Sequence, residues 1–214
     1  MKYTDVAWDF DGCIYDSYPQ INADMQIILA RHGVEASVEE INSYTRVTQG
    51  HAIAHYAPLC GLTPEEFGEE YRGYKDSYLS DLCRPYPGIP ELLRDIAAAG
   101  MKNHICSNRV TEQSRVYLER DGLLPYFDMI TGPDKEKGIA RKPAPDMVAA
   151  VVAQRGISPE KLLMVGDREL DILAAHGAGS HGCFFDPDGC NPQPACVEYI
   201  APDVATLRKI IFGE

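Results

Sequence analysis

The sequence predicts an α/β protein in which helices cover both faces of a parallel sheet and a helical segment is inserted after the first strand. Short apolar runs alternate with helix-length amphipathic segments, which is typical of a parallel sheet. Residues 16–84 interrupt this alternation, because they carry helical signals and no strand candidate. The 214 residues suit one domain with a modest insertion, since a domain usually takes about 100–200 residues.

The expected strands are apolar runs separated by helical segments. They lie at residues 6–8, 104–106, 129–130, 162–165 and 183–185. Between the first two runs, residues 89–96 carry apolar side chains at a spacing of three and four. This spacing predicts a helix, and Gly100 is expected to end it.

Residues 16–84 are expected to form a four-helix insertion. Ile21 begins an apolar helix face that closes at Gly33. Capping boxes at Ser37 and Thr63 predict the starts of two further helices. We therefore expect two domains: an α/β core of residues 1–15 and 85–214, and a helical domain of residues 16–84.

Charge and composition exclude several classes of protein. The 20 Lys and Arg against 32 Asp and Glu give a net charge of −12, which disfavours nucleic acid and anionic membranes as partners. No apolar run approaches the roughly 18 residues of a membrane helix, and the first residues do not resemble a signal peptide. Seven cysteines without a Cys-x-x-Cys pair favour a reducing cytoplasm over a disulfide framework or a zinc site.

The clearest chemical signal is Asp9-Phe10-Asp11-Gly12, directly after the first apolar run. Ligands of parallel sheets bind beyond the carboxyl ends of strands. Two carboxylates there must bind a hard cation or differ in protonation, because neighbouring acids repel each other. Taken alone, the pattern also fits a solvated turn, since Asp and Gly are turn residues.

Three further elements favour a site over a turn. Ser107-Asn108 follows the second expected strand and supplies a hydroxyl group and backbone N–H groups. Lys142 supplies one cation in a segment with two prolines. Asp167 follows the run at residues 162–165, and Asp171 comes four residues later, one helical turn beyond it.

On these residues the sequence resembles the haloacid dehalogenase superfamily, in the branch with a helical cap inserted after the first motif. The resemblance covers residues 6–185 and implies a doubly wound, Rossmann-like parallel core with an α-helical cap domain. It also implies a Mg²⁺-dependent, cytoplasmic phosphatase. Its partner would be a small phosphorylated metabolite, phosphoglycolate-like or a sugar phosphate, hydrolysed through an aspartyl-phosphate intermediate.

The resemblance assigns a role to each motif residue. Asp9 is implied to be the nucleophile and Asp11 the general acid and base. Ser107 is implied to bind a phosphate oxygen, and Lys142 to neutralise charge beside the nucleophile. The implied metal ligands are Asp9, the backbone carbonyl of Asp11, and Asp167. Asp171 is implied to bind the metal directly or through water, or to orient the residues that bind it.

Alternatives within and outside the family are separated by single features. Dehalogenases of this fold lack the second Asp, and phosphonate-cleaving relatives carry a small apolar residue there, so Asp11 disfavours both. Sugar phosphomutases carry a His near the position of Ile21. The absence of this His favours a phosphatase, and a mutase of the same fold stays open as an alternative. A non-enzymatic phospho-aspartate switch is disfavoured by Asp9 on the first strand and by the insertion at residues 16–84. The intact motif residues weigh against a decayed member that only binds its ligand.

Specificity is expected to come from the cap and from loops beside the motifs. The expected substrate contacts are Gly12, Asn108 and Arg46, although Arg46 also suits an exposed loop between two cap helices. Arg109 is expected to meet substrate or solvent. Cys13 stands where the family usually has Thr or Val, and we expect a buried, unreactive thiol.

Overall fold

The structure is a computed structural model that describes residues 2–75 and 77–213. The chain divides into two compact units, one of Met1–Tyr15 with Pro85–Glu214 and the other of Asp16–Arg84. None of the described helices combines the length and the apolar character needed to cross a membrane.

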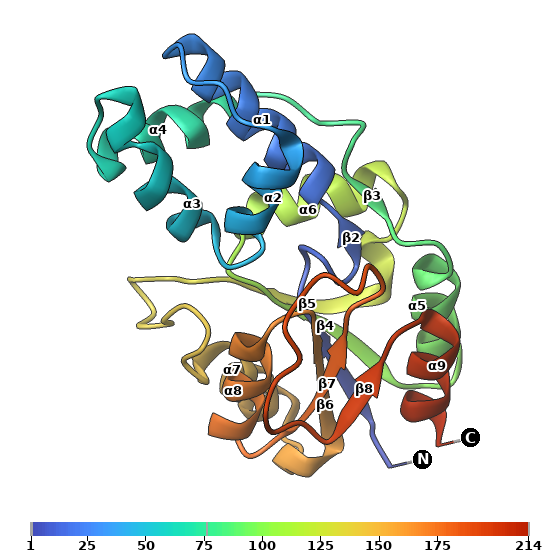
Figure 1. Ribbon diagram of the computed structural model, residues 1–214. Coiled ribbons are helices and arrows are strands. Elements are labelled where there is room, and N and C mark those ends of the chain that lie inside the picture. Colours follow the sequence, from blue (N-terminus) through green and yellow to red (C-terminus); the bar gives the residue numbers. More distant parts are fainter. Residues whose placement is uncertain (1, 76, 214) are drawn as a thin grey trace. The chain divides into compact units, whose positions relative to one another are not determined.

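The first unit contains a parallel sheet (Figure 1). Within the described residues its strands are β1 (Asp5–Trp8), β4 (Lys102–Cys106), β5 (Phe127–Thr131), β6 (Leu162–Gly166), β7 (His181–Phe185) and β8 (Tyr199–Ala201). Their order is β5-β4-β1-β6-β7-β8, and every neighbouring pair is parallel. The predicted parallel α/β core is therefore confirmed.

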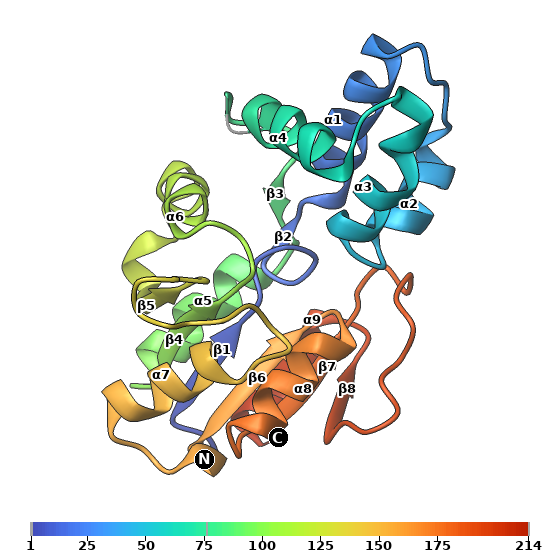
Figure 2. The same ribbon diagram turned by 90° about the vertical axis from the view of Figure 1, so that its left-hand side faces the viewer.

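Helices cover both faces of this sheet (Figures 1 and 2). They are α5 (Ile89–Ala98), α6 (Thr111–Arg120), α7 (Asp146–Arg155), α8 (Glu169–Gly177) and α9 (Val204–Phe212), with short 3-10 turns at Leu124–Tyr126 and Pro159–Lys161. Helices α7 and α8 pack on one face, while α5 and α9 pack on the other. Both faces of β1 and β6 are thus removed from water, which explains why these strands are apolar throughout except at Asp5.

The strand order reverses between β1 and β6. After β1, the chain adds β4 and β5 on one side and then returns to add β6, β7 and β8 on the other. Connections at such a reversal diverge and leave room for a ligand at the carboxyl ends of the strands. Asp9 follows β1 and Asp167 follows β6, so both acids lie at this position.

Strand β8 is not among the strands expected from the sequence. This strand has three residues, and Ile200 in its centre is 44% exposed. An edge strand of this length has no long apolar run to mark it. The predicted helix at residues 89–96 corresponds to α5, and Gly100 follows it with φ of +80°.

The second unit is helical in the residues that the structure describes. Its helices are α1 (Tyr18–Arg31), α2 (Val38–Thr45), α3 (Gln49–Tyr56) and α4 (Pro64–Lys75), with a 3-10 turn at Pro58–Cys60. Ser37 accepts the backbone N–H of Glu40 at the start of α2, and Thr63 and Glu66 form a reciprocal box at the start of α4. Where the chain passes from one unit to the other, β2 (Tyr15–Asp16) pairs with β3 (Arg84–Pro85).

Candidate active site

Asp9 is buried at the end of β1, where its backbone N–H and its Oδ1 have fixed partners. It is 1% exposed, and its backbone N–H donates to the carbonyl of Val165 over 2.8 Å. Its Oδ1 accepts the N–H of Phe10 at 2.8 Å and lies 2.9 Å from Nζ of Lys142. The carboxylate therefore has one fixed orientation, with a cation beside it.

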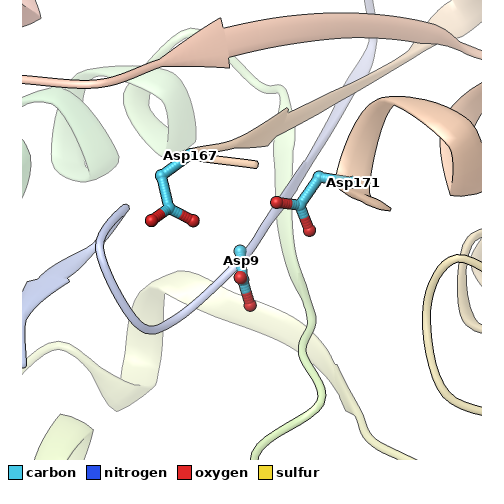
Figure 3. A group of neighbouring side chains, drawn as sticks. All are labelled: Asp9, Asp167 and Asp171. Carbon is cyan, nitrogen blue, oxygen red and sulfur yellow. The ribbon is translucent and has the colours of Figure 1, made fainter. Parts of the chain in front are cut away.

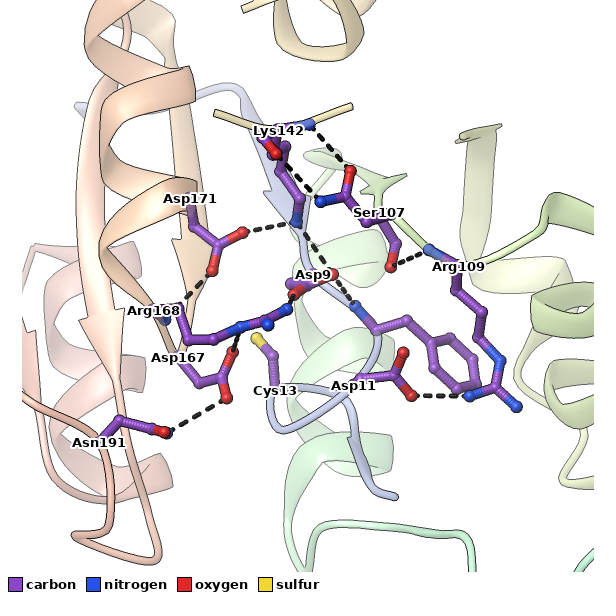
Figure 4. Close-up of polar contacts among 12 residues, drawn as sticks. Asp9, Asp11, Cys13, Ser107, Arg109, Lys142, Asp167, Arg168, Asp171 and Asn191 are labelled. Atoms are coloured by element: carbon purple, nitrogen blue, oxygen red, sulfur yellow. Dashed lines mark hydrogen bonds and ion pairs between the residues drawn. The ribbon is translucent and has the colours of Figure 1, made fainter. Parts of the chain in front are cut away.

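Lys142 lies between two carboxylates (Figure 4). Its Nζ is 2.9 Å from Asp9 and 2.5 Å from Oδ1 of Asp171, and the residue is 3% exposed. Burial by itself would lower the pKa of Lys142, but the charges of Asp171 and Asp9 outweigh burial and raise it. The ammonium group is therefore charged at neutral pH.

Asn108 holds the backbone of Lys142. Its Oδ1 accepts the N–H of Lys142 at 2.8 Å, and its Nδ2 donates to the carbonyl of Lys142 at 3.1 Å. Asn108 is expected from the sequence to bind substrate. In the structure its amide instead fixes the loop that presents the lysine, so a substrate contact of Asn108 stays a prediction.

Asp9, Asp167 and Asp171 come together as a group of buried carboxylates (Figure 3). One oxygen from each residue lies within 4.8 Å of the others. Asp167 precedes α8, whereas Asp171 lies in its first turn and accepts the backbone N–H of Arg168 at 3.1 Å. All the donors are hard carboxylate oxygens, which is the ligand chemistry that Mg²⁺ prefers, so the group fits the expected cation.

Gly166 allows Asp171 to approach the end of β6. A Cβ atom on Gly166 would lie 2.3 Å from Cγ of Asp171, which is closer than real Cβ contacts. Position 166 therefore requires glycine, because any side chain there would collide with Asp171.

Asp11 faces a different neighbour from the other acids. Its Oδ1 lies 2.7 Å from Nη1 of Arg109, whose side chain is 1% exposed. The guanidinium also lies over the rings of Phe10 and Tyr117, at 4.9 and 5.0 Å from their centroids. Arg109 was expected to meet substrate or solvent. It does not meet solvent, because it is buried against Asp11, and a contact with substrate stays a prediction. The roles expected of Asp11, as acid, base and metal ligand through its carbonyl, stay predictions.

Ser107 and Gly12 complete the strand-end loops. Ser107 follows β4, is 2% exposed, and accepts the N–H of Arg109 at its Oγ over 3.2 Å. Gly12 has φ of +74°, which favours glycine, and its N–H donates to the carbonyl of Tyr15 over 2.8 Å. That N–H serves the turn after Asp11, and a substrate contact of Gly12 stays a prediction.

Cys13 is a buried thiol. Its Sγ donates to the carbonyl of Val165 at 3.4 Å. Burial, followed by the negative charges of Asp9, Asp167 and Asp171, raises its pKa well above the ordinary value. The thiol stays protonated at neutral pH, which makes it a poor nucleophile, as the sequence analysis expected.

Two polar neighbours of the acids were not identified from the sequence. The guanidinium of Arg168 lies between two of them, 3.7 Å from Oδ2 of Asp9 and 3.6 Å from Oδ1 of Asp167. Asn191 donates from Nδ2 to Oδ2 of Asp167 at 3.2 Å. Arg168 could have been noticed because it adjoins Asp167, but nothing in the sequence marks Asn191, which lies 24 residues from Asp167 in a loop.

Arg46 belongs to the second unit, immediately after α2. Its guanidinium lies 3.6 Å from the centroid of the Tyr18 ring, and its Nε donates to Oδ1 of Asn42 at 3.4 Å. These contacts orient the side chain within the helical unit. Whether Arg46 contacts substrate stays a prediction.

Comparison with known proteins adds an independent observation. Residues 6–184 match the family model described as haloacid dehalogenase-like hydrolase. The chain is 31% identical to a phosphoglycolate phosphatase of Caulobacter vibrioides over 83% of this chain and 76% of that protein. It is 30% identical to an N-acetylmuramic acid 6-phosphate phosphatase of Pseudomonas aeruginosa, over 84% of this chain and 80% of that protein. A crystal structure of a hydrolase from Deinococcus radiodurans, solved with bound phosphate and sodium, has the same fold, with a TM-score of 0.78, 23% identity and coverage of 99% and 96% of the two chains.

Proposed function

The chain belongs to the haloacid dehalogenase-like hydrolase family, and we propose that it is a Mg²⁺-dependent phosphatase that works through a phosphorylated Asp9. Hydrolysis of a phosphomonoester is the activity of the relatives named above. The proposal of Mg²⁺ dependence and of a phosphorylated Asp9 rests on the fixed carboxylate of Asp9, which lies beside Lys142 and within a group of three acids.

In the first step, the carboxylate of Asp9 attacks the phosphorus atom and the bond to the leaving oxygen breaks. The backbone N–H of Phe10 and the ammonium of Lys142 hold Oδ1, so the attacking group is oriented before substrate arrives. Lys142 and the hydroxyl of Ser107 offset the charge on the transferring phosphoryl group. Asp11 gives its proton to the leaving oxygen, which departs as an alcohol.

In the second step, water attacks the phosphorus of the aspartyl phosphate. Asp11, now ionised, takes a proton from that water, and the phosphorus–oxygen bond to Asp9 breaks. Inorganic phosphate leaves, and both carboxyl groups return to their starting states. The covalent intermediate divides one difficult hydrolysis into two easier steps.

The residues that would hold Mg²⁺ are Asp9 and Asp167, with Asp171 beside them and the backbone carbonyl of Asp11 as a further oxygen. When bound, Mg²⁺ supplies positive charge at the phosphoryl oxygens. Asp171 has a second task, because its Oδ1 holds Lys142 and its Oδ2 accepts the N–H of Arg168. It therefore orients the lysine whether or not it binds the cation.

The relatives support the proposed substrate class, a small phosphomonoester. One acts on phosphoglycolate and another on a sugar phosphate, and both are small phosphomonoesters that also carry a carboxylate. Arg46, oriented by Tyr18 and Asn42, is proposed to contact the part of the substrate that is not transferred. The cytoplasm is part of the proposal, since an odd number of cysteines without paired spacing suits a reducing compartment.

The test is phosphate release from a panel of phosphorylated metabolites, measured with Mg²⁺ and with excess chelator. We expect turnover of one or a few small phosphomonoesters that stops with chelator and returns with Mg²⁺, and none from an Asp9→Asn variant. Turnover that continues in chelator would contradict the metal assignment. Product that keeps its phosphate at a new position would identify a mutase instead.

A further inference from the structure

The loop from Asp186 to Glu198, between β7 and β8, brings Asn191 to the group of acids. Asp186 directly follows β7 and is 9% exposed. Its Oδ2 accepts the backbone N–H of Asn191 at 2.9 Å, and its Oδ1 accepts the side-chain Nδ2 at 3.2 Å. Two bonds from one buried carboxylate therefore fix both the main chain and the amide of Asn191.

The same Nδ2 also donates to Oδ2 of Asp167, at 3.2 Å (Figure 4). The nitrogen thus lies between two carboxylates, which determines the orientation of the amide. If the amide were flipped, Oδ1 would face both carboxylates. All three groups are hydrogen-bond acceptors, so no hydrogen bond could form between them. Asp186 and Asp167 follow neighbouring strands, β7 and β6, so the sheet sets the spacing that Asn191 bridges.

The remaining atom of this amide is unsatisfied. Oδ1 of Asn191 is buried and has no hydrogen-bond partner among the residues that the structure describes. A buried acceptor without a partner costs about 1–3 kcal/mol, so such atoms usually meet a water or a ligand. Amide geometry keeps Oδ1 within about 5.5 Å of the Asp167 oxygen that Nδ2 contacts.

We propose that Asn191 is a positioning residue of the metal site: Asp186 holds its amide, its Nδ2 orients Asp167, and its Oδ1 accepts a hydrogen bond from a water of the bound cation. Mg²⁺ retains several of its waters in proteins, and such waters need acceptors. Hydrogen bonds to a ligating carboxylate fix the direction of its other oxygen and tune the affinity of the site. The inference rests on the proposed function, because it requires that Asp167 binds the cation.

The experiment is a calorimetric titration of Mg²⁺ into the full chain without substrate, with the melting temperature of each variant measured without metal. The variants are Asn191→Leu, which keeps the size of the side chain, and Asn191→Ser. The matched control is Asp188→Asn in the same loop, because Asp188 accepts the hydroxyl of Tyr86 at 2.7 Å and its substitution therefore tests the order of the loop. We expect both Asn191 variants to weaken Mg²⁺ binding by about 10–100-fold, and the control to bind like the wild type.

Asp186→Ala gives an independent result. Because Asp186 acts through Asn191, it should weaken Mg²⁺ binding in the same direction, and the Asp186→Ala, Asn191→Leu double variant should lose less than the sum of the two single losses. The inference is overturned if the wild type binds Mg²⁺ and Asn191→Ser binds it equally well. It is also overturned if Asp188→Asn loses as much affinity, since loop order would then be the cause. A wild type that binds no Mg²⁺ overturns the metal assignment itself, and the inference with it.

Discussion

At the scale of single residues, Asp9 and Asp11 are two aspartates of the same motif, but different side chains surround them. Asp9 is held by Phe10 and Lys142, whereas Asp11 is held by Arg109. The fixed orientation of Asp9 suits a nucleophile, whereas Asp11 has a separate partner and can have a separate task. The difference can be measured with variants that change only the carboxylate.

We expect Asp9→Asn to form no phosphoenzyme and Asp11→Asn to accumulate it with an aryl phosphate. An aryl group leaves without being protonated, so loss of the general acid slows formation of the intermediate less than its breakdown. With an alkyl phosphate, Asp11→Asn should accumulate much less. Intact-mass spectrometry after rapid mixing and acid quench, followed by peptide mapping, measures both. Phosphate on Ser107, or normal turnover by Asp9→Asn, would refute the mechanism.

At the scale of elements, the site depends on where β6 ends and α8 begins. Gly166 is the last residue of β6, and Asp171 lies in the first turn of α8. The close approach of the two elements puts Asp171 against Lys142, which in turn contacts Asp9. A single added methyl group tests this arrangement.

We expect Gly166→Ala to lower kcat by about 100-fold, because the new Cβ collides with Asp171 and displaces the counter-charge of Lys142. Steady-state kinetics on the best substrate of the panel measures the loss. Gly73→Ala in α4 is the control, since a Cβ there would meet no described atom within 4 Å apart from the nearby backbone of its own helix and its chain neighbours. It should keep kcat and gain about 0.5–1 kcal/mol in stability, as alanine favours a helix over glycine. Normal kcat in Gly166→Ala would show that the position of Asp171 is not critical.

The end of α2 gives a second prediction at this scale. Arg46→Ala is expected to change the relative kcat/KM of natural phosphoesters while sparing a small aryl phosphate, because only the natural substrates extend beyond the transferred group. The loss should be largest for substrates that carry a carboxylate. Comparison of kcat/KM across the panel measures it. Equal losses on every substrate would assign Arg46 to catalysis or folding instead.

At the scale of the whole molecule, a buried charge cluster joins the sheet to α7 at the end opposite the site. Asp5 is fully buried; its Oδ1 contacts Nε2 of His104 at 2.8 Å and Nε of Arg155 at 2.7 Å, and its Oδ2 accepts the hydroxyl of Thr4 at 2.7 Å. Burial alone would raise the pKa of Asp5, but hydrogen bonds from His104, Arg155 and Thr4 outweigh it and lower the pKa from 3.8 to about 2.

This lowered pKa predicts how stability depends on pH. The folded state holds the Asp5 proton less tightly than the unfolded state, so the cluster stabilises the protein above pH 4 and loses this contribution as the pH falls towards 2. The contribution at neutral pH is on the order of 2 kcal/mol. Urea denaturation of wild type and Asp5→Asn should differ by this amount at pH 7 and converge near pH 2. Asp95→Asn removes an exposed pair with Arg208 and should change stability by less than about 1 kcal/mol throughout.

The sequence by itself determined the parallel core and the main acids of the site. Apolar runs buried on both faces mark the strands, and Asp9, Ser107 and Asp167 each directly follow one of them, so local order along the chain specifies where these side chains lie. Lys142 is a weak signal alone, and the sequence identified it only together with the acids and Ser107, in the order in which they follow one another along the chain. An apolar run and the polar residue that follows it are neighbours along the chain, so the sequence alone predicts that the residue lies at the end of a strand.

Only the tertiary structure decided which groups hold these residues in place. Arg109 contacts Asp11 across 98 residues, Asn108 contacts Lys142 across 34, and Asn191 contacts Asp167 across 24. An Arg or Asn in a loop has the same appearance in a sequence whether water or a buried carboxylate satisfies it. The difference arises because the sheet brings the ends of distant strands together and removes water from between them, so that a polar side chain there must find its partner in another part of the chain.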